Sequence, residues 1–407
     1  MEEIKNPLKY LGNELEYLKK VLSSENWSAT SGNWNQFFER AFAKKFGRKY
    51  GVALNSGTST LHAALEAAGV GPGDEVISSA ITVIMDTTAT IHANAVPVYC
   101  DVDPDTFNMD PKDLEKRITP KTKAIIPVAL YGLPCDMDPI MEIAKKHNLI
   151  VIEDNAQCYL STYKGRMAGT IGHMASYSFE NTKHISCGEG GIVITDNEKY
   201  AEMVRKVGSH GFKNLKADEG RVRLNADLFQ NPHYKRHDEI GWNYRLAEFL
   251  AAIAFAQLER LDELVRMRVE TAKLFIDVMT SECDYLIPQQ TPEGYTNSYY
   301  TLGVKYFGEE KIGIRWEDFR KAYIDAGGDG FYGAWSVPYL EPVMVERKFV
   351  KRYPEIYKNL YYPQGLCPVA ESIQPRLMQF KTNYRSLELA KIKAESLRKT
   401  IEKFEKK

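Results

Sequence analysis

Short apolar runs alternate with amphipathic stretches between residues 50 and 200 of the chain. The apolar runs are rich in Val and Ile and read "YGVALN", "EVISSAI", "VPVYCDV", "KAIIPVALY", "LIVIEDNA", "HMASYSF" and "GGIVITD". Segments with helical periodicity, such as "STLHAALEAAG" and "MDPIMEIAKKHN", lie between them. Buried strands separated by helices in this way are typical of a mostly parallel sheet with helices on its faces. The pattern therefore predicts an α/β fold.

The period of the pattern changes after residue 240. The stretch "NYRLAEFLAAIAFAQLERLDELVRMRVETAKLFIDVM" has apolar residues three and four positions apart, which predicts one long helix or two helices with a bend. Beyond it, "SYYTLGVKYF" predicts a strand and "WEDFRKAYIDAG" a helix. We predict a large domain over residues 1–250, with an N-terminal helical segment, and a smaller α+β domain over residues 251–407 that the long helix leads into.

Composition narrows the class of protein. Lys and Arg number 53 and Asp and Glu 54, for a net charge of −1, which gives no support for nucleic-acid binding. No stretch approaches about 18 consecutive apolar residues, and the charged N-terminus does not resemble a signal peptide. We therefore expect no membrane association and a cytoplasmic location. The six cysteines are scattered singly, so we expect reduced thiols, no disulfide framework and no metal site.

Four segments contain the residue types that a pyridoxal phosphate site needs. They are "NSGTSTLH" from residue 55, "IEDNAQ" from 152, "SFENTKHISCGEGG" from 178 and "GWNYRLAEF" from 241. The cofactor's phosphate needs several donors, and the free N–H groups of Gly57, Thr58 and Ser59 can supply them at the start of a helix. Taken alone, the first segment is also typical of ordinary helix capping.

A carboxylate and a lysine add to this pattern. Asp154 ends an apolar strand, where a carboxylate can keep the pyridine nitrogen protonated, and Gln157 can reach the ring's 3'-oxygen. The alternative for Asp154 is a capping role in the following turn. Lys183 lies between two predicted buried strands, a rigid place for a lysine that forms a Schiff base. An isolated lysine is more often a solvated surface charge, so the order and spacing of all four segments carry the prediction.

The combined segments resemble a known family. "NSGTSTLHAALEAAGVGPGDEVI", "NAVPVYCDVDPDTFNMD", "VIEDNAQCYLSTYKGRMAGTIG", "SYSFENTKHISCGEGGIVITD" and "GWNYRLAEFLAAIAFAQLERLDEL" are similar to the DegT/DnrJ/EryC1/StrS sugar aminotransferases. These are fold type I pyridoxal phosphate enzymes that aminate nucleotide-linked keto sugars and related keto cyclitols. The similarity is continuous over roughly residues 25 to 270 and looser elsewhere.

The resemblance implies a role for each matching residue. Lys183 would form the Schiff base and then move protons between the substrate carbon and the cofactor, which alternates between pyridoxal and pyridoxamine phosphate. Asp154 would pair with the pyridinium and Gln157 with the 3'-oxygen. Ser178 would bind the phosphate together with the amides of Gly57 and Thr58.

The resemblance also implies an assembly and a reaction type. Asn243 matches a residue that reaches the phosphate of the neighbouring subunit's cofactor, so we expect a homodimer with shared active sites. Some family members have histidine at the lysine position and act as 3-dehydratases. Here Lys183 occupies that position and His184 follows it, which favours the aminotransferase reaction.

Two departures from the family pattern stand out. Val83 occupies a position that is usually aromatic and stacks on the cofactor ring, and loss of the aromatic contribution weakens binding by roughly 0.5 to 1.5 kcal/mol. We expect weaker cofactor retention or an aromatic side chain from elsewhere, with Tyr131 and His184 as candidates. Cys158 and Tyr159 stand where relatives have Ala-His, and they either alter the pocket or pack in the core.

The expected reaction is a ping-pong transamination. Glutamate or glutamine donates the amino group, and the acceptor is a nucleotide-linked keto sugar, with a keto cyclitol of the inosose type or a silent regulatory role as alternatives. Residues 212–241 and 331–342 are the expected places of acceptor specificity. Their candidate ligands are either phosphate-binding or solvated surface groups: Lys213, Lys216, Arg221, Arg223, Lys235, Arg236 and, for a sugar or base, Trp335.

Overall fold

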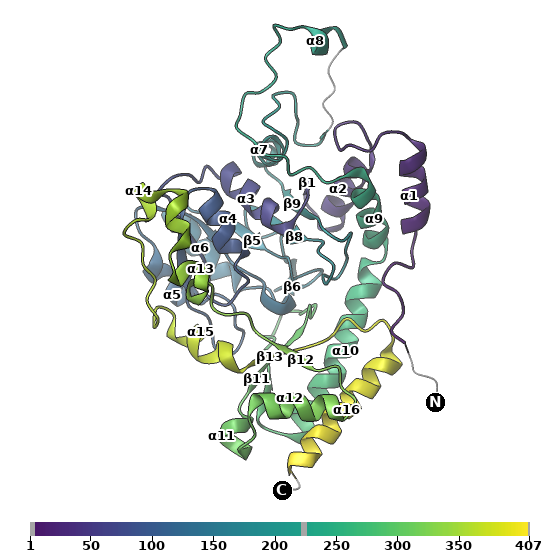
Figure 1. Cartoon of the computed structure of the whole chain (residues 1–407), viewed down its shortest axis with the longest axis vertical. Helices are drawn as coiled ribbons and strands as arrows, with labels where there is room; N and C mark the ends of the chain where they lie inside the picture. Colours follow the sequence, from purple (N-terminus) through teal and green to yellow (C-terminus); the bar gives the residue numbers. More distant parts are fainter. Residues whose placement is uncertain (1–4, 221–225, 406–407) are drawn as a thin grey trace.

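The protein is described here by a computed structural model that covers residues 5–220 and 226–405. Its centre is a seven-stranded sheet with the strand order β1-β9-β8-β5-β4-β2-β3, which Figure 1 shows surrounded by helices. β9 is antiparallel to both of its neighbours, and the other strand pairs are parallel, so the mostly parallel α/β sheet is confirmed. The strands are β1 Tyr50–Leu54, β2 Glu75–Ser79, β3 Val96–Cys100, β4 Thr122–Ile126, β5 Ile150–Asp154, β8 Met174–Ser178 and β9 Gly191–Thr195.

Both faces of this sheet are buried, because successive strand residues point to opposite sides. On β9, Val193 packs toward α3 and α7, whereas Ile192 and Ile194 pack toward α2 and α9. A small hairpin, β6 Thr162–Tyr163 and β7 Arg166–Met167, follows β5. The helices up to residue 230 are α1 Glu14–Ser23, α2 Trp34–Lys45, α3 Gly57–Ala67, α4 Met85–His92, α5 Pro111–Arg117, α6 Met137–His147, α7 Glu198–Gly208 and α8 Ala226–Gln230.

The long helical stretch after residue 240 is two helices with a bend. α9 (Glu248–Glu259) and α10 (Leu261–Glu282) meet at Arg260, whose backbone leaves the helical conformation. α10 leads to a four-stranded antiparallel sheet in the order β10-β11-β13-β12, which α12 and α16 cover. Its elements are β10 Leu286–Pro288, β11 Leu302–Tyr306, α11 Gly308–Ile312, α12 Trp316–Asp325, β12 Phe331–Gly333, β13 Leu377–Phe380 and α16 Leu387–Glu405.

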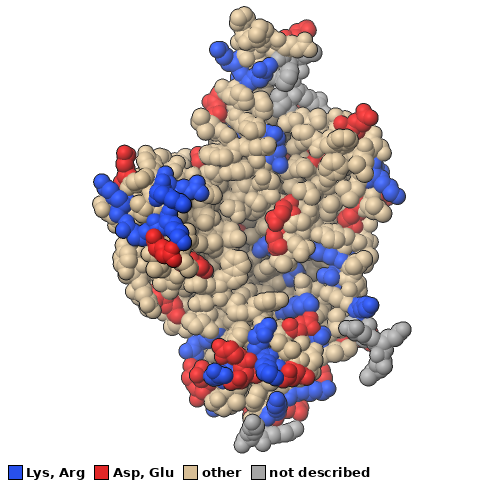
Figure 2. Space-filling view, viewed as in Figure 1, with Lys and Arg blue, Asp and Glu red and all other residues tan. Residues whose placement is uncertain are grey.

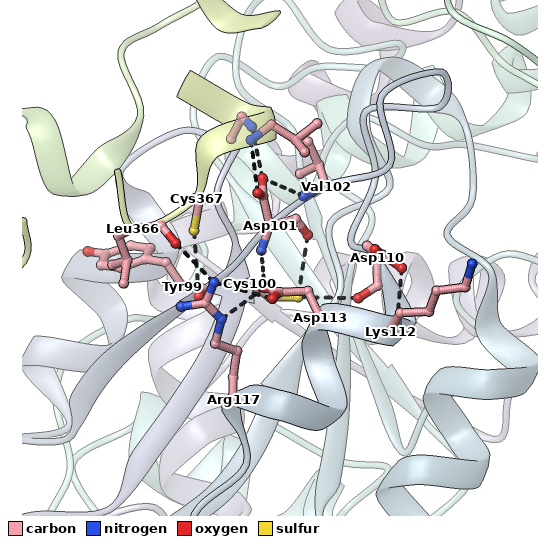
Figure 3. Close-up of polar contacts among 12 residues, drawn as sticks. Tyr99, Cys100, Asp101, Val102, Asp110, Lys112, Asp113, Arg117, Leu366 and Cys367 are labelled. Atoms are coloured by element: carbon pink, nitrogen blue, oxygen red, sulfur yellow. Dashed lines mark hydrogen bonds and ion pairs between the residues drawn. The ribbon is translucent and has the colours of Figure 1, made fainter. Parts of the chain in front are cut away.

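The chain returns to the large sheet between β12 and β13, through α13 (Pro342–Val345), α14 (Pro354–Tyr357) and α15 (Pro368–Ile373). Figure 3 shows how α15 is fixed: Asp101, after β3, accepts the amides of Val369 and Ala370 at 2.9 and 2.8 Å. Arg117 of α5 donates to the Leu366 carbonyl at 2.9 Å. A division into domains at residue 250 stays a prediction, and this returning segment shows that the C-terminal part contacts both sheets.

Charged side chains are unevenly distributed over the surface. Figure 2 shows Lys and Arg gathered over α13 and α14, and both signs mixed over α12 and α16. Within the described ranges, no helix is long and apolar enough to cross a bilayer, and no group of three or more His, Cys, Asp or Glu could hold a metal ion. The six cysteines are unpaired thiols, and five of them are buried.

Candidate active site

A cavity of about 460 Å³ lies at the carboxyl ends of the parallel strands. Asp154 ends β5 and Ser178 ends β8, while the segments after β2 and β4 close the sides. Strand ends of open α/β sheets are the usual place for ligands. Seven of the eight site residues proposed from the sequence line this one cavity: Gly57, Thr58, Val83, Asp154, Gln157, Ser178 and Lys183.

The start of α3 forms one end of the cavity. Gly57 and Thr58 are the first two residues of the helix, so their N–H groups have no acceptor within it. Ser59 behaves differently, because its amide donates to Ser56 Oγ at 3.1 Å in a capping box. The expectation that the Ser59 amide faces a phosphate is therefore corrected, and two amides remain at this end.

Ser178 lies directly against this helix start. A Cβ atom added to Gly57 would stand 2.8 Å from the Ser178 Cβ, a distance that real Cβ atoms do not reach. Glycine is therefore required for the close approach of the two segments. Two amides, one hydroxyl and the positive end of the helix dipole together form a cradle for an anion.

Asp154 and its neighbour Glu153 point to opposite sides of β5. Glu153 accepts the amides of Gly169, Ile171 and Gly172 and holds that loop on the far face. Asp154 lines the cavity, where it accepts the Ala156 amide at 2.9 Å. Burial raises the pKa of Asp154, whereas the Ala156 amide and the Lys183 charge oppose that rise.

Gln157 is oriented by a backbone contact. Its Oε1 atom accepts the amide of Tyr131 at 2.8 Å. This contact fixes the side-chain amide and leaves Nε2 as the available donor toward the cavity. A donor at this position suits an anionic or phenolic oxygen on a bound ring.

Lys183 lies in the loop between β8 and β9, with Nζ 4.5 Å from the centre of the Tyr300 ring. Two basic side chains donate hydrogen bonds to the backbone carbonyls of this loop. Lys9 Nζ donates to the Lys183 carbonyl at 2.7 Å, and Arg268 donates to the carbonyls of Thr182 and Lys183 at 2.8 and 3.3 Å. The loop is thus fixed from residues far away in the sequence, and its lysine side chain is presented to the cavity.

Sequence reasoning did not find Lys9, Arg268 or Tyr300. A signal existed for Arg268, because it falls on the buried stripe of α10 between Leu264 and Thr271, where a charge is unexpected. It also missed Asp86, a fully buried acid on α4 whose pKa is raised by burial and by Asp154.

The structure decides between the two aromatic candidates near Val83. Tyr131 lines the cavity, and its ring packs against the backbone of Gly303. His184 does not line it: the ring is buried on the other side of the loop, with Nε2 2.9 Å from the Ser298 carbonyl. The expectation for His184 is therefore corrected: Thr182 and Lys183 both line the cavity, whereas the next residue in this irregular loop turns into the core. Tyr300 and Trp335 are the further aromatic residues of the cavity wall.

Cys158 and Tyr159 belong to the core and not to the cavity wall. Both are 0% exposed, and the Tyr159 hydroxyl donates to the Ser178 carbonyl at 2.5 Å. Tyr159 therefore supports the phosphate end indirectly, by fixing the backbone of Ser178.

The acceptor candidates are divided between two places. Trp335 lines the cavity together with Ala334 and Gln379. Residues 212–220 and 226–241 belong to the arm that carries α8, which Figure 1 shows projecting beyond α7. Arg221 and Arg223 are outside the described residues. The other cations of the arm are not part of the cavity wall: Lys213, Lys216, Lys235 and Arg236.

Asn243 also stands apart from this cavity. It is exposed and pairs with Ser209 beside α7. No neighbouring subunit is present, so contact with a second cofactor stays a prediction. An exposed polar residue next to α7 is available for such a contact.

These residues fit pyridoxal phosphate. The anion cradle at Gly57, Thr58 and Ser178 suits the phosphate, the buried Asp154 carboxyl suits a protonated ring nitrogen, and Gln157 Nε2 suits the ring oxygen. Lys183 is the cavity-lining amine that can bind covalently. Among known proteins, the model of the DegT/DnrJ/EryC1/StrS aminotransferase family matches residues 10–315.

The chain belongs to this family. Its members are pyridoxal phosphate-dependent aminotransferases, and the match assigns the chain to that class of enzyme. It is 42% identical to a GDP-perosamine synthase of Caulobacter vibrioides over 257 residues, which are 63% of this chain and 64% of that relative. It is 35% identical to the spore coat polysaccharide biosynthesis protein SpsC of Bacillus subtilis over 353 residues, 87% of this chain and 86% of that one.

The fold of this aminotransferase is that of solved relatives. An aminotransferase from Psychrobacter cryohalolentis superimposes with a TM-score of 0.83 at 28% identity, over 99% of both chains. The fold type I architecture predicted from the sequence is thereby confirmed.

Proposed function

We propose that this aminotransferase transfers an amino group from glutamate or glutamine to the keto group of a nucleotide-linked sugar, with a GDP-linked keto sugar as the leading acceptor. One observation carries the proposal: a lysine amine, a buried carboxyl and an anion cradle line the same cavity. The Caulobacter relative, whose name states that it makes GDP-perosamine, supports the GDP-linked acceptor.

Binding residues hold the cofactor at three points in this proposal. Gly57, Thr58 and Ser178 bind the phosphate, Asp154 faces the ring nitrogen, and Gln157 donates to the ring oxygen. When bound, pyridoxal phosphate supplies a carbonyl that condenses with amines and a ring that withdraws electrons. Contacts at three separate points would hold the cofactor in one orientation relative to Lys183.

Lys183 has two tasks in the reaction. Its Nζ atom would hold the cofactor covalently, and as a free amine it would accept a proton from the donor's carbon and return it. The fixed backbone of Lys183 limits this movement to the side chain, because Lys9 and Arg268 both bind its carbonyl.

The acceptor enters along the wall of Tyr300, Trp335 and Gln379. Lys183 is the one Lys or Arg among the described residues that line this cavity. The phosphates of a nucleotide sugar therefore need cations from elsewhere. A homodimer in which the described part of the arm, residues 212–220 and 226–241, and Asn243 reach the neighbouring cavity meets that need.

Two half-reactions test the proposal separately. Purified protein is first loaded with pyridoxal phosphate, and its visible absorbance is followed after addition of glutamate or glutamine, beside a Lys183→Ala variant. The loaded protein is then offered GDP-, UDP- and dTDP-linked keto sugars and a keto inositol, and products are identified by mass spectrometry. Amination of a GDP-linked sugar alone would support the proposal. Exclusive amination of the keto inositol would replace the acceptor, and a spectrum that no donor changes would contradict the proposed activity.

A further inference from the structure

Seven carboxyl side chains are buried among the residues that the structure describes: Glu14, Glu39, Asp86, Asp101, Glu153, Asp154 and Glu248. Five of them accept at least two N–H groups each. Glu153, for example, accepts three amides, and Glu39 accepts both Nη atoms of Arg205. Such donors stabilise an ionised carboxylate in a dry interior.

Asp86 and Asp154 are the two exceptions, and their side chains lie within hydrogen-bonding reach of each other. Asp154 accepts one amide, from Ala156. Asp86 accepts no N–H group other than its own backbone amide: Thr82 Oγ1 donates to its Oδ2 atom at 2.7 Å, and its Oδ1 atom is buried without a hydrogen-bond partner. Asp86 is 0% exposed and is not part of the cavity wall, so water does not supply its missing donors. Asp154, at the cavity wall, is 3% exposed.

Two ionised carboxylates in this arrangement would be unstable. Each would lack donors, and like charges at short range in a dry site exclude double ionisation. Burial and the charge of Asp154 raise the pKa of Asp86 well above its ordinary value. The charge of Lys183 lowers the pKa of Asp154 and so favours ionisation of Asp154 over that of Asp86. The other titratable neighbour, Tyr99, stays neutral because burial raises its pKa.

We propose that Asp86 is a positioning residue that carries a proton and donates it, as a hydrogen bond, to Asp154. This donation gives the unpartnered Oδ1 atom of Asp86 its partner. It also fixes the Asp154 side chain and leaves one negative charge on the pair, directed at the position of the pyridine nitrogen. The inference rests on the proposed placement of the cofactor ring at Asp154.

The same pair sets how strongly Asp154 attracts the ring. A carboxylate that accepts a strong hydrogen bond is a weaker base than one without it. Thr82 fixes the second oxygen of Asp86, so the acid proton is directed toward Asp154 and not toward Thr82. Asp86 thus acts through Asp154 and does not itself contact the cavity.

Infrared difference spectroscopy of the full-length, cofactor-loaded protein tests the shared proton directly. A protonated carboxylic acid has a carbonyl band that ionised carboxylates lack and that shifts in D₂O. We expect this band in the wild type, its loss in Asp86→Asn, and its retention in Asp101→Asn, where the replaced acid accepts two amides of α15. A wild type without the band, or a band that survives in Asp86→Asn, would overturn the proposal.

Cofactor affinity provides a second measurement with a conservative rescue. Asp86→Asn keeps an N–H donor toward Asp154, so its Kd for pyridoxal phosphate should stay within about threefold of the wild type. Asp86→Leu removes the donor to a charged group and should raise that Kd by about tenfold or more. Equal Kd values for Asn and Leu variants that both fold would argue against a positioning role.

The two proposals can fail independently. The infrared band does not depend on any acceptor sugar, so its absence overturns the shared proton even in an active enzyme. Conversely, if the protein shows the band but aminates no nucleotide sugar, the proposed acceptor is wrong and the proposal of a shared proton stands.

Discussion

The two ends of the active-site cavity are built differently. The cofactor end consists of strand ends, a helix start and short buried side chains, and Asp154, Gln157 and Ser178 are each less than one tenth exposed. The other end, named the acceptor end after its proposed ligand, consists mostly of loops from the C-terminal part together with Gln379 of β13, and there Trp335 is 56% exposed. Rigid elements hold a cofactor in one geometry, whereas loops vary the substrate on a constant scaffold. Substitutions at the two ends should therefore affect different steps of the reaction.

Replacement of Lys183 should have the largest effect. Lys183→Ala removes the amine that binds covalently and transfers the proton, so transamination should fall on the order of 10³-fold or more. The rate of the first half-reaction with glutamate, measured by visible absorbance, checks this.

Lys199→Ala is the matched control for Lys183, since Lys199 is exposed on α7 and distant from the cavity. Its half-reaction rate should equal that of the wild type. Substantial turnover by Lys183→Ala would show that another group performs the proton transfer.

The cofactor end could be predicted well from the sequence because its signals are local. Lys183 lies between two apolar strands, Asp154 ends a third, and "SGTST" opens a helix, so each segment carries its own pattern. The alternation of strands and helices likewise predicts the mostly parallel sheet, but not its strand order, which depends on contacts between segments distant in the chain. Families preserve such local segments, which explains why the resemblance and the observed cavity agree on seven residues.

The supports of this end could not be predicted, since their partners are distant in the chain. Lys9 binds the carbonyl of Lys183 across 174 positions, and Arg268 binds it from α10. His184 was misplaced for a related reason: periodicity does not give side-chain directions in an irregular loop. At the acceptor end, Tyr300 lies in an irregular segment and Gln379 on β13, and neither carries a local pattern that points to the cavity, so the sequence singled out only Trp335.

Gly57→Ala should weaken the cofactor end by a steric effect. The added Cβ atom would meet Ser178 at 2.8 Å and push the two sides of the anion cradle apart. We expect the Kd for pyridoxal phosphate to rise about tenfold, since each 1.4 kcal/mol lost is a factor of ten. Equilibrium titration of the cofactor-free protein measures it.

Gly71→Ala provides the control for that titration, because a Cβ atom there meets nothing within 4 Å. Its cofactor Kd should not change. If Gly57→Ala bound the cofactor as tightly as the wild type, the phosphate would have to lie elsewhere in the cavity.

Trp335→Ala should affect only the acceptor end. Stacking of a base on an aromatic ring contributes about 1–3 kcal/mol, so KM for the nucleotide sugar should rise about tenfold. The half-reaction with glutamate should keep its rate. Tyr332, on the same segment but outside the cavity wall, gives the control variant Tyr332→Ala. An equal loss in both half-reactions would mean that Trp335 supports the cofactor, and the distinction between the two ends would fail there.

The smallest expected effect on the reaction concerns the support behind Lys183, whose loss acts on stability. Burial, followed by the charges of Arg268 and Arg385, lowers the pKa of Lys9 from 10.5 to about 7. The unfolded chain keeps the ordinary value, so between pH 7 and 10.5 it binds more protons than the folded chain does. The contribution of Lys9 to the free energy of unfolding therefore rises with pH in this window, by up to about 1.4 kcal/mol per pH unit.

Lys9→Met should have a flatter dependence of Tm on pH from 7 upward, whereas Lys19→Met, at an exposed position of α1, should follow the wild type. Parallel curves for the wild type and Lys9→Met would mean that the pKa of Lys9 is the same in the folded and the unfolded chain. Its hydrogen bond to the Lys183 carbonyl would then contribute equally to stability at every pH in this window.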